Sequence, residues 1–397
     1  MSNVPKLRFG EFDGEWSLHS IGDLSDCIVP GRNKPKSFDG SIPWITTPDI
    51  SSKYILGSET ELRITTDEAQ RTGNRVVPVD SIIMSCVGEL GVTAINKTPI
   101  VINQQLHAFL PQDNQSVEFL AYQIGRQTKY MEIVATKTSV PYMNKQSCNS
   151  IPITLPTPSE QQKIAAFLTA VDTKIEQLTQ KEALLKQYKK GVMQKLFSQE
   201  IRFKADDGNE FPEWSNAKLS QVADVVGGGT PDTSISDYWD GEIDWFTPTE
   251  IKTKYLGHSA RKISEKGLAK SSAKLLPVGT LLLSTRATVG DVGISTAPCT
   301  TNQGFQSLVV NDQNDHEFVY YWICFNKREL VRRASGSTFL EIGKKELSQI
   351  IIQSPSLEEQ SKIASFLQSL DSKLMHLADQ LTSAKTFKKG LLQQMFV

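Results

Sequence analysis

The residues that could carry catalysis are scattered along this chain of 397 residues. The five histidines show no H-x-x-x-H spacing and the five cysteines form no C-x-x-C pair, so neither a metal site nor a disulfide framework is indicated. The segment from Gly336 to Lys345 (GSTFLEIGKK) has the wrong spacing for a phosphate-binding loop and lacks its hydroxyl residue. Gly227–Gly229 precede Thr230-Pro231, which is typical of a turn. We therefore predict no catalytic residue, no metal and no cofactor in this chain.

Side chains suited to binding DNA are more prominent than catalytic ones. Ser284–Thr288 lies between two expected strands and contains Arg286, and arginine can bind guanine through two hydrogen bonds. A surface arginine without a ligand is an equally good interpretation of Arg286. Asn103-Gln104 and Asn302-Gln303 could pair with adenine. The stronger alternative for these two pairs is that they hold a turn by side-chain hydrogen bonds.

Basic and polar residues elsewhere form further candidate clusters. Cations near Arg32 and Lys252 could contact DNA phosphates, whereas cations late in a helix could simply complement its dipole. A polar set that follows an expected helix includes Tyr142 in one half of the chain, and Thr338 and Glu341 in the other; its role is open. The candidate DNA-binding residues are Arg32, Lys34, Lys36, Thr46, Thr47, Val87, Glu89, Asn103, Gln104, Tyr142, Asn144 and Lys145 in the first half, and Thr247, Lys252, Lys254, Thr285, Arg286, Thr288, Asn302, Gln303, Lys344 and Lys345 in the second.

The chain is a tandem repeat, and these clusters recur in both halves. Trp16 matches Trp214, and from Pro78 onward the offset between matching residues stays at 199. Two copies are too few for a solenoid, so each copy is expected to be a globular unit followed by a long helix. Residues that read different sequences should differ between the copies. The segment Val87–Leu90 differs from its match, Arg286–Val289. These two segments are therefore better candidates for sequence specificity than the Asn-Gln pairs, which both copies share.

The most regular segments are two expected long helices, Glu160–Phe197 and Glu359–Phe396. Their apolar residues recur at steps of four and three, which predicts a heptad seam. Ser159 is a plausible N-cap of the first helix, because prolines at positions 156 and 158 should prevent an earlier start. Lys189 and Lys388 interrupt the two seams at matching positions, where they could fix the register or extend to water. The expected seam residues are Ile164, Leu168, Val171, Ile175, Leu178, Leu185 and Val192 in the first helix, and Ile363, Leu367, Leu370, Leu374, Leu377, Leu381 and Leu391 in the second.

The sequence pattern predicts an α+β fold for each globular unit. Short strands are expected at 81–86, 92–96 and 106–110, with copies at 280–284, 292–295 and 307–310, and a helix follows near Val117–Ala135 or Glu317–Ala334. Antiparallel pairing of the long helices as a coiled coil would relate the two globular domains by a pseudo-twofold axis. That geometry suits a DNA target made of two half-sites. The expected divisions are 1–158, 159–200, 201–357 and 358–397, which alternate globular domain and spacer helix.

Composition excludes several other classes of protein. An apolar fraction of 39% and a net charge of −1 are ordinary for a globular protein and give no overall attraction to DNA. No apolar run approaches the roughly 20 residues of a membrane span, and the first residues contain no apolar core of a signal peptide. Because the cysteines are few and widely spaced, we expect a cytoplasmic protein.

The chain resembles the specificity subunit of type I restriction-modification enzymes, the HsdS family, over essentially its whole length. The resemblance is carried by PWITTPDI and DWFTPTEI, by LLSTRATVGDVGI and TNQGFQSL, and by PTPSEQQKIAAFL and PSLEEQSKIASFL at the starts of the two helices with their KKG-x-x-Q endings. No single motif is decisive, but their order and repetition are highly specific. QLHAF in the first copy departs from GFQSL in the second, which puts equal roles for these segments in doubt.

The resemblance implies a protein that directs other subunits to DNA. Each globular unit would be a target recognition domain that reads one half of a bipartite site in double-stranded DNA, and the helices would set the unread gap. The chain would have no activity of its own. It would bind two methyltransferase subunits, which use S-adenosylmethionine, and two restriction subunits, which use ATP and Mg.

Two alternatives remain open from the sequence. A coiled-coil structural adaptor without direct DNA contact gains from the near-neutral charge. A fused enzyme with unrecognised chemistry is disfavoured because no nucleophile, metal or phosphate constellation is apparent.

Overall fold

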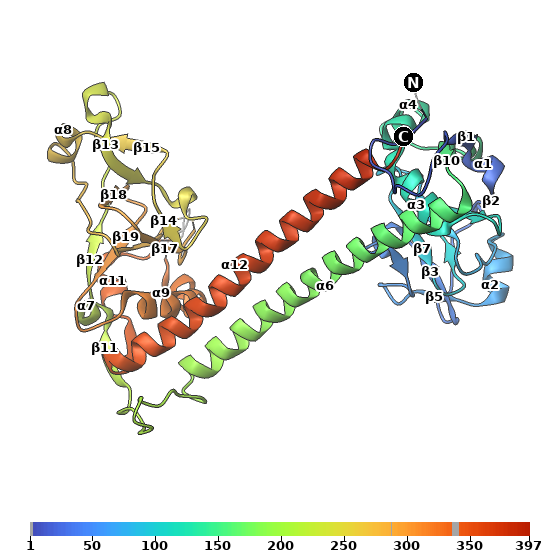
Figure 1. Cartoon of the computed structure of the whole chain (residues 1–397). Helices are drawn as coiled ribbons and strands as arrows, with labels where there is room; N and C mark the ends of the chain where they lie inside the picture. Colours follow the sequence, from blue (N-terminus) through green and yellow to red (C-terminus); the bar gives the residue numbers. More distant parts are fainter. Residues whose placement is uncertain (1–2, 287, 336–340) are drawn as a thin grey trace. The chain divides into compact units, whose positions relative to one another are not determined.

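The structure, a computed structural model, describes residues 3–286, 288–335 and 341–397. The chain forms two compact units. The first unit comprises Met1–Gln180 with Ala378–Val397, and the second comprises Lys181–Leu377. Each unit therefore contains one α+β domain and one half of each long helix, α6 (Pro158–Phe197) and α12 (Leu357–Gln394), which are green and red in Figure 1.

The first unit is built on a five-stranded sheet with the order β2-β9-β6-β7-β4. A three-stranded sheet, β5-β3-β8, and a two-stranded sheet, β1-β10, complete its strands. Most neighbours pair antiparallel, but β4 runs parallel to β7 and β3 runs parallel to β8. The elements are β1 (Ser17–Ser20), α1 (Ile21–Leu24), β2 (Ser25–Ile28), β3 (Ile42–Ile45), η1 (Thr47–Asp49), β4 (Tyr54–Ile55), β5 (Arg63–Ile64), α2 (Thr66–Arg71), β6 (Ile82–Ser85), β7 (Thr93–Asn96), β8 (Val101–Ile102), β9 (Leu106–Pro111), α3 (Val117–Arg126), α4 (Thr128–Val134), α5 (Lys145–Asn149) and β10 (Pro152–Leu155).

The second unit repeats this plan strand for strand. Its sheets have the orders β12-β19-β16-β17-β14, β15-β13-β18 and β11-β20. The same two pairs, β14 with β17 and β13 with β18, run parallel. The elements are β11 (Ser215–Lys218), α7 (Leu219–Val222), β12 (Ala223–Gly227), η2 (Ser236–Tyr238), β13 (Trp239–Phe246), η3 (Pro248–Glu250), β14 (Tyr255–Leu256), β15 (Arg261–Ile263), α8 (Glu265–Ala269), β16 (Leu281–Leu283), β17 (Val292–Ser295), β18 (Cys299–Thr301), β19 (Gln306–Val310), α9 (His316–Phe325), α10 (Lys327–Arg333), α11 (Lys344–Ser348) and β20 (Ile351–Ser354).

One predicted helix in each unit is wrong in its length. The segments expected to be continuous helices are each divided in two, at Gln127 between α3 and α4 and at Asn326 between α9 and α10. The Asn326 side chain donates a hydrogen bond to the Trp322 carbonyl at 2.9 Å. Short polar side chains compete for backbone groups in this way and favour helix ends, so a polar residue at this position ends the first helix.

The predicted start of the first long helix, Glu160, is also wrong by two residues. The helix α6 begins at Pro158, before the expected N-cap Ser159. Proline is well tolerated at the first helical position, because its missing N–H would have no partner in the helix. The first backbone bond then runs from the Gln161 amide to the Thr157 carbonyl, at 2.9 Å.

The halves of the two long helices pack together within each unit. In the first unit, Ile164 and Leu168 of α6 share a core with Leu391 of α12. In the second unit, Leu196 of α6 shares a core with Ile363 and Leu367 of α12. The start of one helix therefore meets the end of the other, which makes the pair antiparallel. All fourteen residues expected to form the seam are buried or half-buried.

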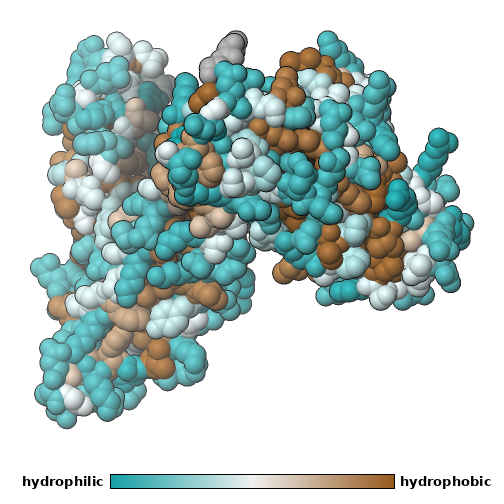
Figure 2. All heavy atoms as spheres, turned by 45° about the vertical axis from the view of Figure 1, so that its right-hand side comes forward, coloured by the Kyte–Doolittle hydropathy of each residue, from teal (hydrophilic) through white to brown (hydrophobic). Residues whose placement is uncertain are grey.

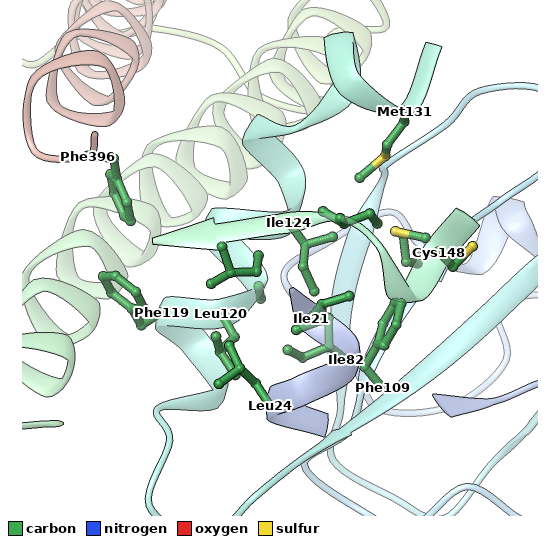
Figure 3. Packing of buried hydrophobic residues seen from close by; sticks show 14 of the residues in the cluster. Ile21, Leu24, Ile82, Phe109, Phe119, Leu120, Ile124, Met131, Cys148 and Phe396 are labelled. Carbon is green, nitrogen blue, oxygen red and sulfur yellow. The ribbon is translucent and has the colours of Figure 1, made fainter. Parts of the chain in front are cut away.

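The end of each long helix completes the core of the unit formed by the other copy. Phe396, just beyond α12, stacks on Phe119 of α3 with ring centroids 5.3 Å apart, and Trp16 packs against it edge-on at 6.1 Å. Figure 3 shows Phe396 beside Phe119 at one edge of this core. The matching residue Phe197, at the end of α6, packs against Phe318 in the second unit at 5.6 Å. Each core is therefore closed by a residue of the other sequence copy.

Hydrophilic residues cover most of the face drawn in Figure 2, with hydrophobic residues gathered in patches between them. Among the residues that the structure describes, no helix has the length and apolar character needed to cross a membrane.

Candidate nucleic-acid interface

Five loops of the first unit come together: residues 29–36, 46–50, 86–91, 103–105 and 136–144, here called the first loop cluster. Hydrogen bonds join them to one another. The Gln104 side chain donates to the Gly31 carbonyl at 3.1 Å, and the Cys86 amide donates to the Gln105 carbonyl at 2.8 Å. The Gly88 amide donates to the Pro141 carbonyl at 3.0 Å. These bonds hold loops from distant parts of the sequence as one surface.

The second unit has the matching second loop cluster, comprising residues 228–235, 247–251, 284–286, 288–291, 302–304 and 341–343. The Thr230 hydroxyl bonds the Gln303 side chain, and the Thr285 amide donates to the Gly304 carbonyl at 2.9 Å. The Ile342 amide donates to the Thr285 carbonyl at 3.0 Å. The two clusters thus share one backbone plan.

Most of the predicted DNA-binding residues lie in these clusters or beside them. Arg32, Lys34 and Lys36 are exposed in one loop of the first cluster, and Glu89 and Tyr142 are exposed in others. The remaining exposed candidates are Gln104, Asn144, Lys145, Lys252, Arg286, Thr288, Gln303, Lys344 and Lys345. Thr338 lies outside the described residues.

Several candidates shared by the two copies hold the shape of the loops. The side-chain Oδ1 of Asn103 accepts from the Gln105 backbone amide at 3.0 Å, and Oδ1 of Asn302 accepts from the Gly304 backbone amide at 2.9 Å. The hydroxyl groups of Thr46 and Thr247 each donate, at 2.7 Å, to the acidic residue three positions on. These contacts are the turn-holding bonds that the alternative interpretation of the Asn-Gln pairs expects.

Three further candidates are also held by contacts within the first unit. The Asn144 side chain caps α5 by accepting from the Ser147 amide at 2.9 Å. Thr47 bonds the Gln105 side chain at 3.2 Å, and Val87 is half-buried where it bridges to Tyr142.

Two predicted DNA-binding residues are corrected by their burial. Thr285 is only 1% exposed, and its hydroxyl faces the Gly304 carbonyl. Lys254 points inward, where its ammonium lies 2.8 Å from the Tyr321 hydroxyl and 2.6 Å from Glu317. Neither side chain is free to meet DNA. The fold turns these two side chains toward protein groups.

A polar junction that was not predicted from the sequence fixes each domain to the long helices. In the first unit, the Tyr122 hydroxyl of α3 donates to Asp172 of α6 at 2.5 Å. Lys53 donates to the same hydroxyl at 2.7 Å, and Lys388 of α12 lies 2.6 Å from Asp172. Burial lowers the pKa of Lys53 to about 8, and burial together with the bond to Asp172 raises the pKa of Tyr122. The helices α3, α6 and α12 therefore meet at one partly buried polar group.

The second unit contains the same junction. Tyr321 of α9 donates to Asp371 of α12 at 2.5 Å, and Lys189 of α6 pairs with that carboxylate. Lys254 takes the place of Lys53. Burial and the bond to Asp371 raise the pKa of Tyr321. The matching tyrosine, aspartate and lysine positions at the constant offset were the sequence signal that could have predicted this junction.

A second missed feature fixes the start of each long helix. Arg8 holds Glu160 with two hydrogen bonds, at 2.8 and 2.7 Å, and Arg202 holds Glu359 at 3.1 and 2.8 Å. Both glutamates are fully buried. The bond to Glu160 raises the pKa of Arg8, and the bond to Glu359 raises that of Arg202. Buried carboxylates are stable only when paired in this way.

Within the described parts of the chain, no group of three or more His, Cys, Asp or Glu side chains could hold a metal ion. Burial raises the pKa of the Cys27 thiol to about 11 and that of Cys86 to about 12, which disfavours the reactive thiolate. The clusters offer hydrogen bonds, charge and apolar contact.

Comparison with known proteins agrees with this picture. The family model described as type I restriction modification DNA specificity domain matches residues 14–187 and 212–383. The MjaIX specificity subunit of Methanocaldococcus jannaschii is 38% identical over 181 residues, which cover 44% of this chain and 42% of the relative. The MjaVIII specificity subunit of the same organism is 24% identical over 386 residues, or 90% of this chain and 86% of the relative.

Solved structures show the same fold. The S subunit of a type I restriction-modification system from M. genitalium aligns with a TM-score of 0.63 at 17% identity, covering 99% of each chain. A chain from a study of complex assembly in a type I restriction-modification system aligns with a TM-score of 0.60 at 19% identity, covering 97% of this chain and 98% of its own. With the family model matched in both halves, the chain belongs to the family of type I restriction-modification DNA specificity subunits.

Proposed function

We propose that each loop cluster reads one half of a bipartite DNA target, and that the paired long helices set the distance between the halves. One observation carries this proposal. The two clusters share a backbone plan and the residues that shape it, such as Asn103 and Asn302, yet differ at matched positions, where half-buried Val87 corresponds to exposed Arg286. This pattern is expected when the same backbone scaffold carries two sets of side chains that recognise different DNA sequences.

The chain, itself non-catalytic as a specificity subunit, would act with partners. The family resemblance implies two methyltransferase subunits, which methylate adenine with S-adenosylmethionine, and two restriction subunits, which use ATP and Mg. One similar solved structure comes from work on the assembly of such a system. Cytoplasmic double-stranded DNA would be the substrate of that assembly.

The first experiment is a map of modified adenines in cells that express this chain with its methyltransferase, compared with cells that lack this chain. We expect one motif with two defined halves and a fixed gap. Methylation without sequence preference would contradict the proposal. If the complex binds specific duplexes equally well with and without this chain, the adaptor interpretation is favoured instead.

The second experiment tests the spacing role of the helices. Seven residues are inserted after Gln180 in α6 and after Leu377 in α12, which keeps the heptad pattern and lengthens each helix by about 10 Å. At about 3.4 Å per base pair, the gap should grow by about three base pairs while both halves of the motif stay unchanged. The control inserts the heptad in only one helix, which should disturb assembly. An unchanged gap in the doubly extended protein would refute the role.

A further inference from the structure

In the second loop cluster, Arg286 is held by Glu341. The two residues form an isolated backbone bridge, and the Arg286 Nε and Nη2 atoms both donate to Glu341 Oε2, at 3.0 and 2.7 Å. The pair stays open to solvent, with side chains 49% and 38% exposed. An arginine in this position is fixed in orientation but not covered.

Among the described residues, the pairing with Glu341 leaves the Nη1 end of the guanidinium without a hydrogen-bond partner. Arginine carries five N–H groups, and the bonds to Glu341 use the one on Nε and one on Nη2. Both N–H groups of Nη1 and one of Nη2 remain. These two nitrogens form the fork that matches O6 and N7 of guanine in the major groove. Because Glu341 fixes the plane of the guanidinium, less conformational freedom remains to be lost on binding.

The matched positions in the first unit carry different chemistry on the same backbone. Val87 and Tyr142 also form an isolated bridge, and the Gly88 amide bonds the Pro141 carbonyl beside it. Val87 is half-buried and Tyr142 is 39% exposed. Neither side chain carries a charged group with two parallel hydrogen-bond donors. An apolar and aromatic pair suits the methyl group of thymine rather than the acceptors of guanine.

We propose that Arg286 reads a guanine in the half-site bound by the second unit, and that Glu341 is the residue that positions its guanidinium. The matched pair of the first unit, Val87 with Tyr142, cannot read guanine in this way. This inference rests on the proposed function and adds to it the identity of one base and the residue that recognises it.

The competing interpretation is a surface ion pair that only ties two loops together. Exposed pairs of this kind contribute little to stability. Such a pair would not make binding depend on one atom of one base. The experiment therefore changes the base as well as the protein.

The test uses the chain assembled with its methyltransferase and duplexes that carry the motif obtained from the map of modified adenines. Each guanine is replaced in turn by 7-deazaguanine, which lacks N7, or by inosine, which keeps N7 and O6. We expect one guanine whose 7-deaza replacement weakens wild-type binding by about 5- to 150-fold, while inosine has little effect. Arg286→Ala, which loses the contacts to both O6 and N7, should bind the natural duplex with at least as large a loss and should be indifferent to 7-deazaguanine at that position.

Control variants separate reading from folding. Val87→Ala, at the matched position, should leave the 7-deazaguanine effect intact and change only the other half of the motif. Arg286→Lys keeps the charge without the fork, and should retain affinity better than Arg286→Ala while losing most of the discrimination. Glu341→Gln should reduce the discrimination by less than Arg286→Ala does.

The outcomes distinguish this inference from the proposed function. If the wild-type complex has no bipartite motif, the proposed function fails and this inference fails with it. A bipartite motif in which no guanine is sensitive to loss of N7 overturns only the inference, and requires no variant to fold. The inference would likewise be overturned if the Arg286→Ala complex distinguished guanine from 7-deazaguanine as strongly as the wild-type complex does.

Discussion

Lys388 of α12 lies 2.6 Å from Asp172 of α6, and Lys189 of α6 pairs in the same way with Asp371 of α12. These are the two lysines that interrupt the heptad seams. Each lysine of one sequence copy thus pairs with the aspartate of the other copy. Of the two roles open from the sequence, fixing the register is the one that this geometry supports, because the pairs form only when the helices run antiparallel in this alignment.

Loss of this ion pair should destabilise the first unit. Lys388→Met removes the partner of a partly buried carboxylate, so we expect a loss of about 1–3 kcal/mol in the free energy of unfolding, between the values for exposed and buried pairs. Urea unfolding measures the change. Lys389→Met, at the adjacent exposed position, should change stability by less than about 0.5 kcal/mol. Equal effects of the two variants would show that the pair does not fix the register.

Replacing a seam leucine by alanine should lower the free energy of unfolding more where the leucine side chain is more deeply buried. Leu370 is 3% exposed in the core of the second unit, whereas Leu374 is half-buried. Leu370→Ala should cost about 2–5 kcal/mol, and Leu374→Ala less. Met375 is 66% exposed, so Met375→Ala is the matched control with little expected effect. Equal unfolding midpoints for Leu370→Ala and Met375→Ala would mean that the seam is not a buried contact.

Removal of Arg8 should leave a buried charge without a partner. Glu160 is fully buried, so Arg8→Met should cost about 3–5 kcal/mol. The double variant Arg8→Met with Glu160→Met should recover most of that loss, because both charges are gone. Lys6→Ala, at a nearby exposed position, is the control. If the double variant is as unstable as the single one, packing rather than charge explains the defect.

The first unit should lose stability in mild acid because of His107. This side chain is 4% exposed, its Nδ1 has no hydrogen-bond partner among the described residues, and burial lowers its pKa from 6.5 to about 4. Between these values the unfolded chain binds the proton and the folded chain does not, so stability falls as the pH drops from 6.5 to 4. The loss contributed by His107 is at most about 3 kcal/mol.

A matched substitution tests this acid sensitivity. The second copy has Gln306 at the position of His107, so His107→Gln should flatten the dependence of unfolding free energy on pH between 6.5 and 4. His316→Gln, at an exposed position of the second unit, is the control substitution. An unaltered slope in His107→Gln would assign the acid sensitivity to other groups.

Local patterns were enough to predict several features of the fold. The constant offset revealed the duplication, and the steps of three and four revealed two long helices with one seam each. Their antiparallel pairing followed because two similar stripes in one chain need a partner. The predicted strands at 81–86, 92–96 and 106–110 correspond to β6, β7 and β9 within a residue at each end. These features depend on neighbours in the sequence, which spacing records directly.

Tertiary structure alone decided which side chains meet and which way they face. The sequence did not distinguish Lys254, held inside by Tyr321 and Glu317, from Lys252, which is exposed. It also did not predict the strand order or that Phe396 closes the core around Phe119. The physical reason is the same in each case. Strand pairing, burial and ion pairing depend on groups that are distant in the chain, and these groups come together only when the whole unit has folded.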